Sequence, residues 1–156
     1  ARFAGAKEIV VTDVSDYPLS LAARVGASET INVARTPERL APHAKNKGTF
    51  DVLFEASGNE VALRGALDVL RPGGIIVQLG LGGEMKIPVN ALVTKELQLR
   101  GTFRFDEEFQ LAVDLMGKGL VDVKPLLTEI VPFEQAVAAF DLASDRSRAM
   151  KVQLAF

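Results

Sequence analysis

Apolar residues are grouped into short runs along the first half of the chain, and polar or small residues separate these runs. Three runs are long and rich in β-branched residues, at 8–14, 51–56 and 75–81. Uninterrupted apolar runs of this length are typical of strands that are buried on both faces of a parallel sheet. A shorter run at 30–33 predicts one further strand.

Helical segments are predicted between these strands. Pro18 presets the first turn of one helix, and Gly26 ends it. Residues 36–38 provide a cap, a proline and a first-turn acid for a second helix, which Pro42 should disturb. A third helix is expected at 60–70. The alternation of strand and helix predicts an α/β fold with right-handed parallel connections in one sheet.

The pattern changes after residue 82. The following elements are expected in order: an edge strand at 86–89, a short helix at 90–96, a strand at 97–103, a helix capped by Asp106, a second amphipathic helix at 134–143, and a closing strand at 151–156. We place a domain boundary near residues 101–104. The predicted domains are therefore 1–101 and 102–156.

The composition narrows the partners and the chemistry. Nearly half of the 156 residues are hydrophobic, and the net charge is only −2, so we expect a globular cytoplasmic protein that binds neither nucleic acid nor membranes. The chain has no cysteine, which excludes cysteine nucleophiles and thiolate zinc sites within it. The single histidine, His43, lies in a polar stretch and is interpreted as a solvated side chain.

Candidate binding residues follow directly after the apolar runs, because ligands of open parallel sheets bind beyond the carboxyl ends of the strands. Asp13 ends the first run, and its carboxylate could accept both hydroxyl hydrogens of an adenosine ribose. The same charge would repel a 2′-phosphate, which favours NAD over NADP. The alternative is that Asp13 is merely a polar residue at the end of a strand.

Glycines and one arginine also follow strands. Gly58, Gly80 and Gly82 could let a ring or a pyrophosphate approach the backbone, although glycines are common in turns of any kind. Arg104 stands between Phe103 and Phe105, where its guanidinium would be partly desolvated and could hold a carboxylate or polyhydroxy substrate. The alternative for Arg104 is a salt bridge that links two domains.

Taken in order, five segments of the chain resemble the zinc-dependent medium-chain dehydrogenases. They are IVVTDV (9–14), RVGA (24–27), FDVLFEASG (50–58), LRPGG (70–74) and LGLGGEM (79–85). Three later segments are similar to the sorbitol dehydrogenase branch of that family: LRGTFRF (99–105), VKPLL (123–127) and KVQLAF (151–156). Each segment alone is weak evidence, but the ordered set is specific and runs through essentially the whole chain.

This resemblance implies a Rossmann-type NAD-binding domain in 1–101 and the C-terminal segment of the substrate domain in 102–156. It implies NAD and zinc as cofactors and a polyol or sugar acid as substrate. The implied cofactor-binding residues are Asp13 at the ribose, Ser57 and Gly58 at the adenosine half, Leu79, Gly80 and Leu81 at the nicotinamide half, and Thr102, Phe103 and Arg104 after the last strand. Arg104 and Phe105 would line the substrate pocket.

The chain departs from the family pattern in several places. Pro18 stands where relatives commonly have a basic residue five positions after the ribose acid, and Phe105 replaces a tyrosine of the animal sorbitol dehydrogenases. The first strand, the glycine-rich turn and the zinc ligands of the family are not found. We therefore expect an incomplete sheet, zinc ligands upstream of this chain, no catalytic or metal-binding residue within it, and no activity of the chain alone.

Three further expectations complete the sequence-based interpretation. Homo-oligomers are expected by analogy, through the segments near 86–89 and 97–100. A methyltransferase with the same kind of sheet is an alternative, because an acid after the second strand and an LRPGG turn also occur there. A non-catalytic nucleotide-binding or assembly module is the other alternative.

Overall fold

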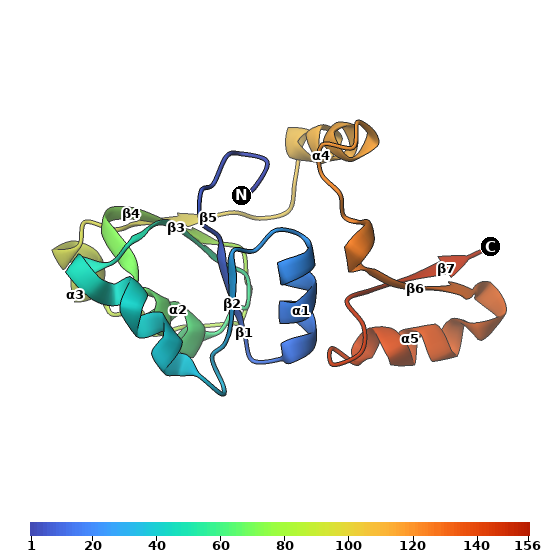
Figure 1. Ribbon diagram of the computed structural model, residues 1–156, viewed down its shortest axis with the longest axis horizontal. Helices are drawn as coiled ribbons and strands as arrows, with labels where there is room; N and C mark the ends of the chain where they lie inside the picture. The colour runs from blue at the N-terminus through green and yellow to red at the C-terminus, as the bar shows by residue number, and fades with distance from the viewer. The chain divides into compact units, whose positions relative to one another are not determined.

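The computed structural model describes all 156 residues, and the chain forms two compact units. The terminal unit consists of residues 1–39 and 106–156, and the central unit consists of residues 40–105. Figure 1 follows the elements of both units along the chain. No helix is both long enough and apolar enough to cross a membrane.

The central unit is a parallel three-stranded sheet with the order β3-β4-β5. Its elements are β3 (Phe50–Glu55), α2 (Glu60–Ala66), β4 (Leu70–Gln78), α3 (Val89–Thr94) and β5 (Gln98–Gly101). Leu63, Leu67, Leu70 and Ile76 form the buried core of this unit. The Lys95 ammonium donates hydrogen bonds to the carbonyl oxygens of Leu67, Asp68 and Leu70 at 2.8–3.0 Å, and so closes the end of α2 onto the start of β4.

The terminal unit contains two parallel strand pairs. β1 (Val10–Asp13) and β2 (Glu29–Asn32) pair in register from Val10 with Glu29 to Asp13 with Asn32, and α1 (Asp16–Arg24) connects them. α1 packs beside this pair (Figure 1) and buries Leu19 and Leu21. The second pair is β6 (Leu127–Pro132) and β7 (Lys151–Ala155), with α5 (Ala136–Ser144) as the crossover.

Four short or isolated elements complete the fold. α4 (Glu107–Gly117) has no buried residue, and two single 3₁₀ turns, η2 (Lys124–Leu126) and η3 (Phe133–Gln135), flank β6. η1 (Pro37–Lys47) is a 3₁₀ segment with Pro42 inside it and non-helical backbone at Lys45 and Asn46. The predicted disturbance of a helix by Pro42 is therefore confirmed.

The single sheet expected from the alternating pattern is not formed. The hydrogen-bonded ladders are three separate parallel sheets, β1-β2, β3-β4-β5 and β6-β7. β1 is only partly buried, and Val14 after it is 68% exposed, so the expectation of a strand buried on both faces is wrong for this strand. The parallel direction of every strand pair nevertheless agrees with the predicted α/β class.

Three local predictions are also wrong. Residues 86–88 form no strand; Ile87 packs on the core instead, and Val89 begins α3. The helix expected at 60–70 ends at Ala66, and the expected turn at 71–74 lies inside β4 as an irregularity of the ladder, since Phe50 pairs with Leu70 but Val52 with Ile75. The Asp106 side chain does not cap α4. The Glu108 carboxylate accepts the Asp106 N–H at 3.0 Å instead.

The core of the central unit gives a stability prediction. Leu63 of α2 is 1% exposed, and replacing it with alanine leaves a cavity among side chains that pack around it. We expect Leu63→Ala to lower the free energy of unfolding by about 2–5 kcal/mol in urea titrations. Val61 of the same helix is 78% exposed, so Val61→Ala is the matched control and should change the free energy of unfolding by less than about 0.5 kcal/mol. Equal losses for both variants would contradict the described packing.

Candidate functional site

The carboxyl ends of β1 and β2 bring Asp13 and Asn32 side by side, because these two residues are partners in the parallel ladder. The Asp13 Oδ1 atom accepts a hydrogen bond from the Ser15 backbone N–H at 2.9 Å, in a turn that leads into α1. Its Oδ2 atom lies 3.8 Å from a guanidinium nitrogen of Arg146, beyond hydrogen-bond distance. The Asp13 side chain is 23% exposed, so one carboxylate oxygen is available to a hydroxyl donor.

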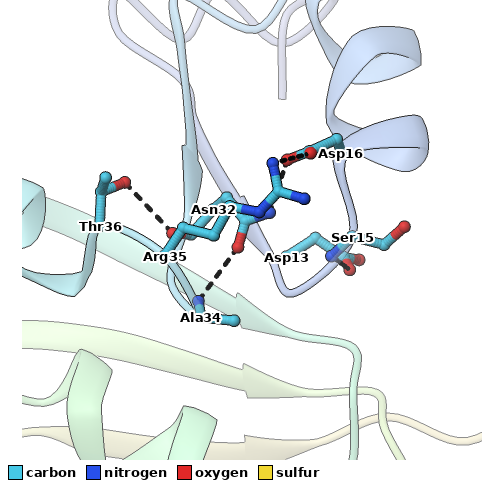
Figure 2. Close-up of polar contacts among 7 residues, drawn as sticks. All are labelled: Asp13, Ser15, Asp16, Asn32, Ala34, Arg35 and Thr36. Atoms are coloured by element: carbon cyan, nitrogen blue, oxygen red, sulfur yellow. Dashed lines mark hydrogen bonds and ion pairs between the residues drawn. The ribbon is translucent and has the colours of Figure 1, made fainter.

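A second polar network continues from Asn32 (Figure 2). Asn32 is buried, and its side-chain N–H donates to Asp16 Oδ1 at 2.5 Å, while its Oδ1 atom accepts from the Ala34 N–H at 3.1 Å. The other Asp16 oxygen pairs with the Arg35 guanidinium at 2.5 Å. Thr36 also donates to the Asn32 carbonyl oxygen. The loop after β2 is therefore tied to the first turn of α1.

In the central unit, the carboxylate of Glu55 holds together the two loops that follow β3 and β4. Glu55 is 4% exposed, and its carboxylate accepts hydrogen bonds from the Ser57 hydroxyl, from the Ser57 and Gly58 N–H groups at 2.9 Å each, and from the Gln78 amide at 2.5 Å. The carbonyl oxygen of Glu55 also accepts the N–H groups of Leu79 and Gly80. The end of β3 therefore fixes the path of both loops.

The Glu55 carboxylate is ionised in this environment. Burial by itself would raise the pKa of Glu55, but the hydrogen bonds from Ser57, Gly58 and Gln78 outweigh burial and lower the pKa below the usual 4.5. Donors directed at the charged form explain this direction. The negative charge thus acts as an acceptor that gathers loop amides, since no cation is among the causes of its lowered pKa.

The glycines of these loops pack against one another. A Cβ atom on Gly80 would collide with the Gly58 backbone and with the Glu55 carboxylate, and one on Gly82 would collide with the Gly58 carbonyl group. Gly58 itself has a φ of +65°, and a Cβ there would lie 2.7 Å from the Gly82 nitrogen. Loop-to-loop packing therefore already requires glycine at all three positions, whether or not a ligand approaches.

The residues predicted after β5 form an exposed segment. The Thr102 N–H donates to the Gln78 carbonyl oxygen at 3.1 Å, which extends the pairing with β4 by one residue. The Arg104 guanidinium lies 5.1 Å from the centre of the Phe103 ring. Phe103 and Phe105 are 68% and 69% exposed and Arg104 is exposed as well, so the expected partial desolvation of the guanidinium is wrong for this chain.

Arg104 also has an unusual backbone conformation. Its φ of 59° is in the left-handed region, which residues other than glycine rarely adopt. Strain of this kind is concentrated at functional positions, so it supports Arg104 as a site residue on grounds that are independent of its charge.

Sequence reasoning missed several residues of these networks. Asn32 and Glu55 end strands, as Asp13 does, and the rule that selected Asp13 could have selected them too. Gln78 also ends a strand. Arg146, in contrast, lies 133 residues from Asp13 (146 − 13) in a turn after α5, and no local pattern connects the two.

The chain does not hold a zinc site by itself. No group of three or more His, Cys, Asp or Glu side chains is arranged to hold a metal ion. The chain also lacks cysteine altogether. The residues present therefore do not fit the catalytic zinc that the family resemblance implies.

Similar proteins of known sequence are dehydrogenases and reductases. L-idonate 5-dehydrogenase (NAD(P)(+)) of Escherichia coli strain K12 is 40% identical over 153 residues, which are 97% of this chain and 44% of that protein. D-xylulose reductase A of Aspergillus oryzae is 35% identical, covering 90% of this chain and 41% of that protein. The chain thus spans less than half the length of these relatives.

Solved structures agree with the fold. The crystal structure of the Escherichia coli L-idonate 5-dehydrogenase matches 99% of this chain and 44% of that chain, with a TM-score of 0.91 and 40% identity. An Escherichia coli CFT073 alcohol dehydrogenase crystallised with NADH matches 96% of this chain and 45% of that chain, with a TM-score of 0.84 and 26% identity. The expected likeness to the sorbitol and idonate dehydrogenases is therefore confirmed.

The lowered pKa of Glu55 predicts a pH dependence of stability. Because the folded pKa is below the unfolded value, the stabilisation by this carboxylate is present above pH 4.5 and is lost as the pH falls through the folded pKa. Glu55→Gln should therefore lower the free energy of unfolding at pH 7, and it should also reduce the loss of stability between pH 7 and pH 4 in urea titrations. Glu84→Gln, in an exposed position of the same unit, controls for the loss of one negative charge. An unchanged pH profile in Glu55→Gln would contradict the prediction.

One family model covers most of the chain. The model of the zinc-binding dehydrogenases matches residues 1–118, which include Asp13, the Glu55 network and the glycine loops. Together with relatives that match nearly the whole chain, this model leads to one conclusion. The chain belongs to the zinc-binding dehydrogenase family.

Proposed function

We propose that this chain supplies the cofactor-binding part, and the C-terminal part of the substrate domain, of an oxidoreductase that transfers a hydride between NAD and a secondary alcohol of a polyol or sugar acid. L-idonate is the first substrate to test. The observation that carries this proposal is the 40% identity, over 97% of the chain, to an L-idonate 5-dehydrogenase. The presence of Asp13 at the end of β1 supports it from the chemistry of the site.

Asp13 is proposed to bind the adenosine ribose of the cofactor. A carboxylate at the end of a parallel strand accepts hydrogen bonds from both ribose hydroxyl groups. In the structure, Ser15 uses only Oδ1, and Oδ2 has no donor within hydrogen-bond distance. The donor set and the 23% exposure of Asp13 therefore suit this role.

The loops of the central unit are proposed to contact the rest of the cofactor. Ser57 and Gly58 are assigned to the adenosine half, although their donors are already bound to Glu55, so these two residues would contribute shape rather than hydrogen bonds. Leu79, Gly80 and Leu81 are assigned to the nicotinamide half. Leu79 and Leu81 are 45% and 80% exposed and can offer apolar surface to a ring.

The segment after β5 is proposed to reach both cofactor and substrate. The backbone of Thr102 and Phe103 is assigned to the nicotinamide carboxamide, and Arg104 and Phe105 are assigned to the substrate pocket. A guanidinium can hold a carboxylate with two parallel hydrogen bonds. This geometry suits a sugar acid better than a neutral polyol.

The family's zinc would polarise the alcohol oxygen, but the residues of this chain do not fit the metal. We therefore assign no catalytic residue to the chain and propose that it does not complete the reaction alone. We also propose a homo-oligomer, for which β5 is the natural candidate, since it is an edge strand with four exposed residues. A methyltransferase is disfavoured, because β6 and β7 are parallel rather than an antiparallel hairpin and because the family match covers residues 1–118.

The proposal is tested with the product of the complete reading frame that contains these residues. We expect reduction of NAD at 340 nm with L-idonate, loss of activity on zinc chelation, and recovery when zinc is restored. Asp13→Ala should raise the KM for NAD about tenfold or more and change kcat little, because one charge-assisted contact is worth about 1.5–3 kcal/mol. Failure to bind NADH, or activity that survives zinc removal, would contradict the proposal.

The role of Arg104 gives a separate prediction. Arg104→Ala should reduce kcat/KM for a sugar acid more than for a neutral polyol such as sorbitol, by about tenfold in the ratio, because only the sugar acid offers a carboxylate to the guanidinium. Arg100, an exposed arginine of β5, provides the control Arg100→Ala. Equal losses for both substrates in steady-state kinetics would show that Arg104 does not recognise the carboxylate.

A further inference from the structure

Four charged side chains gather at the carboxyl ends of β1 and β2. Asp13 faces Arg146 at 3.8 Å, and Asp16 pairs with Arg35 at 2.5 Å. Asn32 connects the two pairs, since it is the ladder partner of Asp13 and donates to Asp16. Two negative charges are therefore balanced by two guanidinium groups at this edge of the terminal unit.

This balance changes the electrostatic argument about the ribose acid. A single carboxylate at this position repels the 2′-phosphate of NADP, and that argument favours NAD. Pro18 occupies the position where a basic residue is common in the family, so the helix that follows β1 supplies no cation there. Arg35, from the loop after β2, and Arg146, from the turn after α5, supply cations from other parts of the chain.

Both arginines are free to redirect their guanidinium groups. Their side chains are 73% and 79% exposed, and exposed ion pairs contribute little to stability, so a phosphate can compete for either group. A guanidinium binds phosphate with two parallel hydrogen bonds, and it is less strongly hydrated than an ammonium group. A dianionic phosphate beside Asp13 would therefore find two donors and not only a repelling acid.

We propose that Arg35 and Arg146 determine the cofactor preference of this chain by receiving the 2′-phosphate of NADP next to Asp13. The site then accepts both NAD and NADP. This inference rests on the proposed function, because it assumes that Asp13 lies at the adenosine ribose. It extends that function by naming two specificity residues outside the strand-end position of the acid.

The test compares NADPH and NADH on the product of the complete reading frame. Dissociation constants are measured by fluorescence titration, and kcat/KM is measured with each oxidised cofactor. The variants are Arg35→Ala, Arg146→Ala and the conservative Arg146→Lys. Arg39→Ala is the matched control, because Arg39 is an exposed arginine whose ion pair with Glu29 lies at the opposite end of β2 from Asn32.

We expect Arg35→Ala and Arg146→Ala each to weaken NADPH binding about tenfold while NADH binding changes less than about twofold. Arg146→Lys should recover part of the loss, and NADPH binding by the unchanged protein should fall more steeply with salt than NADH binding. A merely structural role of the arginines would affect both cofactors alike.

Two results would overturn the inference. If NADH binds but the ratio of NADPH to NADH affinity is the same in Arg35→Ala, Arg146→Ala and Arg39→Ala, the arginines do not read the 2′-phosphate, and the dehydrogenase proposal stands. If neither cofactor binds to the unchanged protein, the proposed function itself fails, and the inference fails with it.

Discussion

The hydrogen bonds that converge on the Glu55 carboxylate are the interaction on which the central unit depends. A carboxylate that is 4% exposed is costly to bury unless donors surround it, and here the donors come from the loop after β3 and from Gln78 at the end of β4. The same contacts bring the backbones of Gly58, Gly80 and Gly82 so close that no Cβ fits between them. Charge satisfaction and glycine packing are thus two aspects of one constraint.

The terminal unit solves a similar problem with exposed charges. Asp13 and Asp16 stand near the start of α1, where each carboxylate accepts a hydrogen bond, from the Ser15 N–H and the Asn32 amide respectively, and faces an arginine. Because these ion pairs are exposed, they hold the loops weakly and can be exchanged for contacts with an anionic ligand. The central unit is therefore built for fixed shape, and this edge of the terminal unit is built for exchangeable charge.

This difference matters for the family to which the chain belongs. Zinc-binding dehydrogenases are a family of enzymes, and relatives of this chain include one whose name covers both NAD and NADP. The glycine loops and the Glu55 network supply rigid surface, whereas cofactor preference can change through a few exposed arginines without disturbing the core. The chain itself offers no cluster of metal ligands, so its contribution to the chemistry is binding and orientation.

The sequence by itself determined the α/β class, the parallel strands at β1, β2, β3 and β5, and the family, because apolar runs and turn residues are local signals that survive without tertiary contacts. It also placed Asp13 at a strand end. It could not reveal the division into three separate ladders, the coil at 86–88 or the end of α2 at Ala66, since these depend on which segments pair and pack. The contact between Asp13 and Arg146, and the Glu55 network, were decided only by tertiary structure, because the groups that satisfy a charge are chosen by distance in space and not by spacing along the chain.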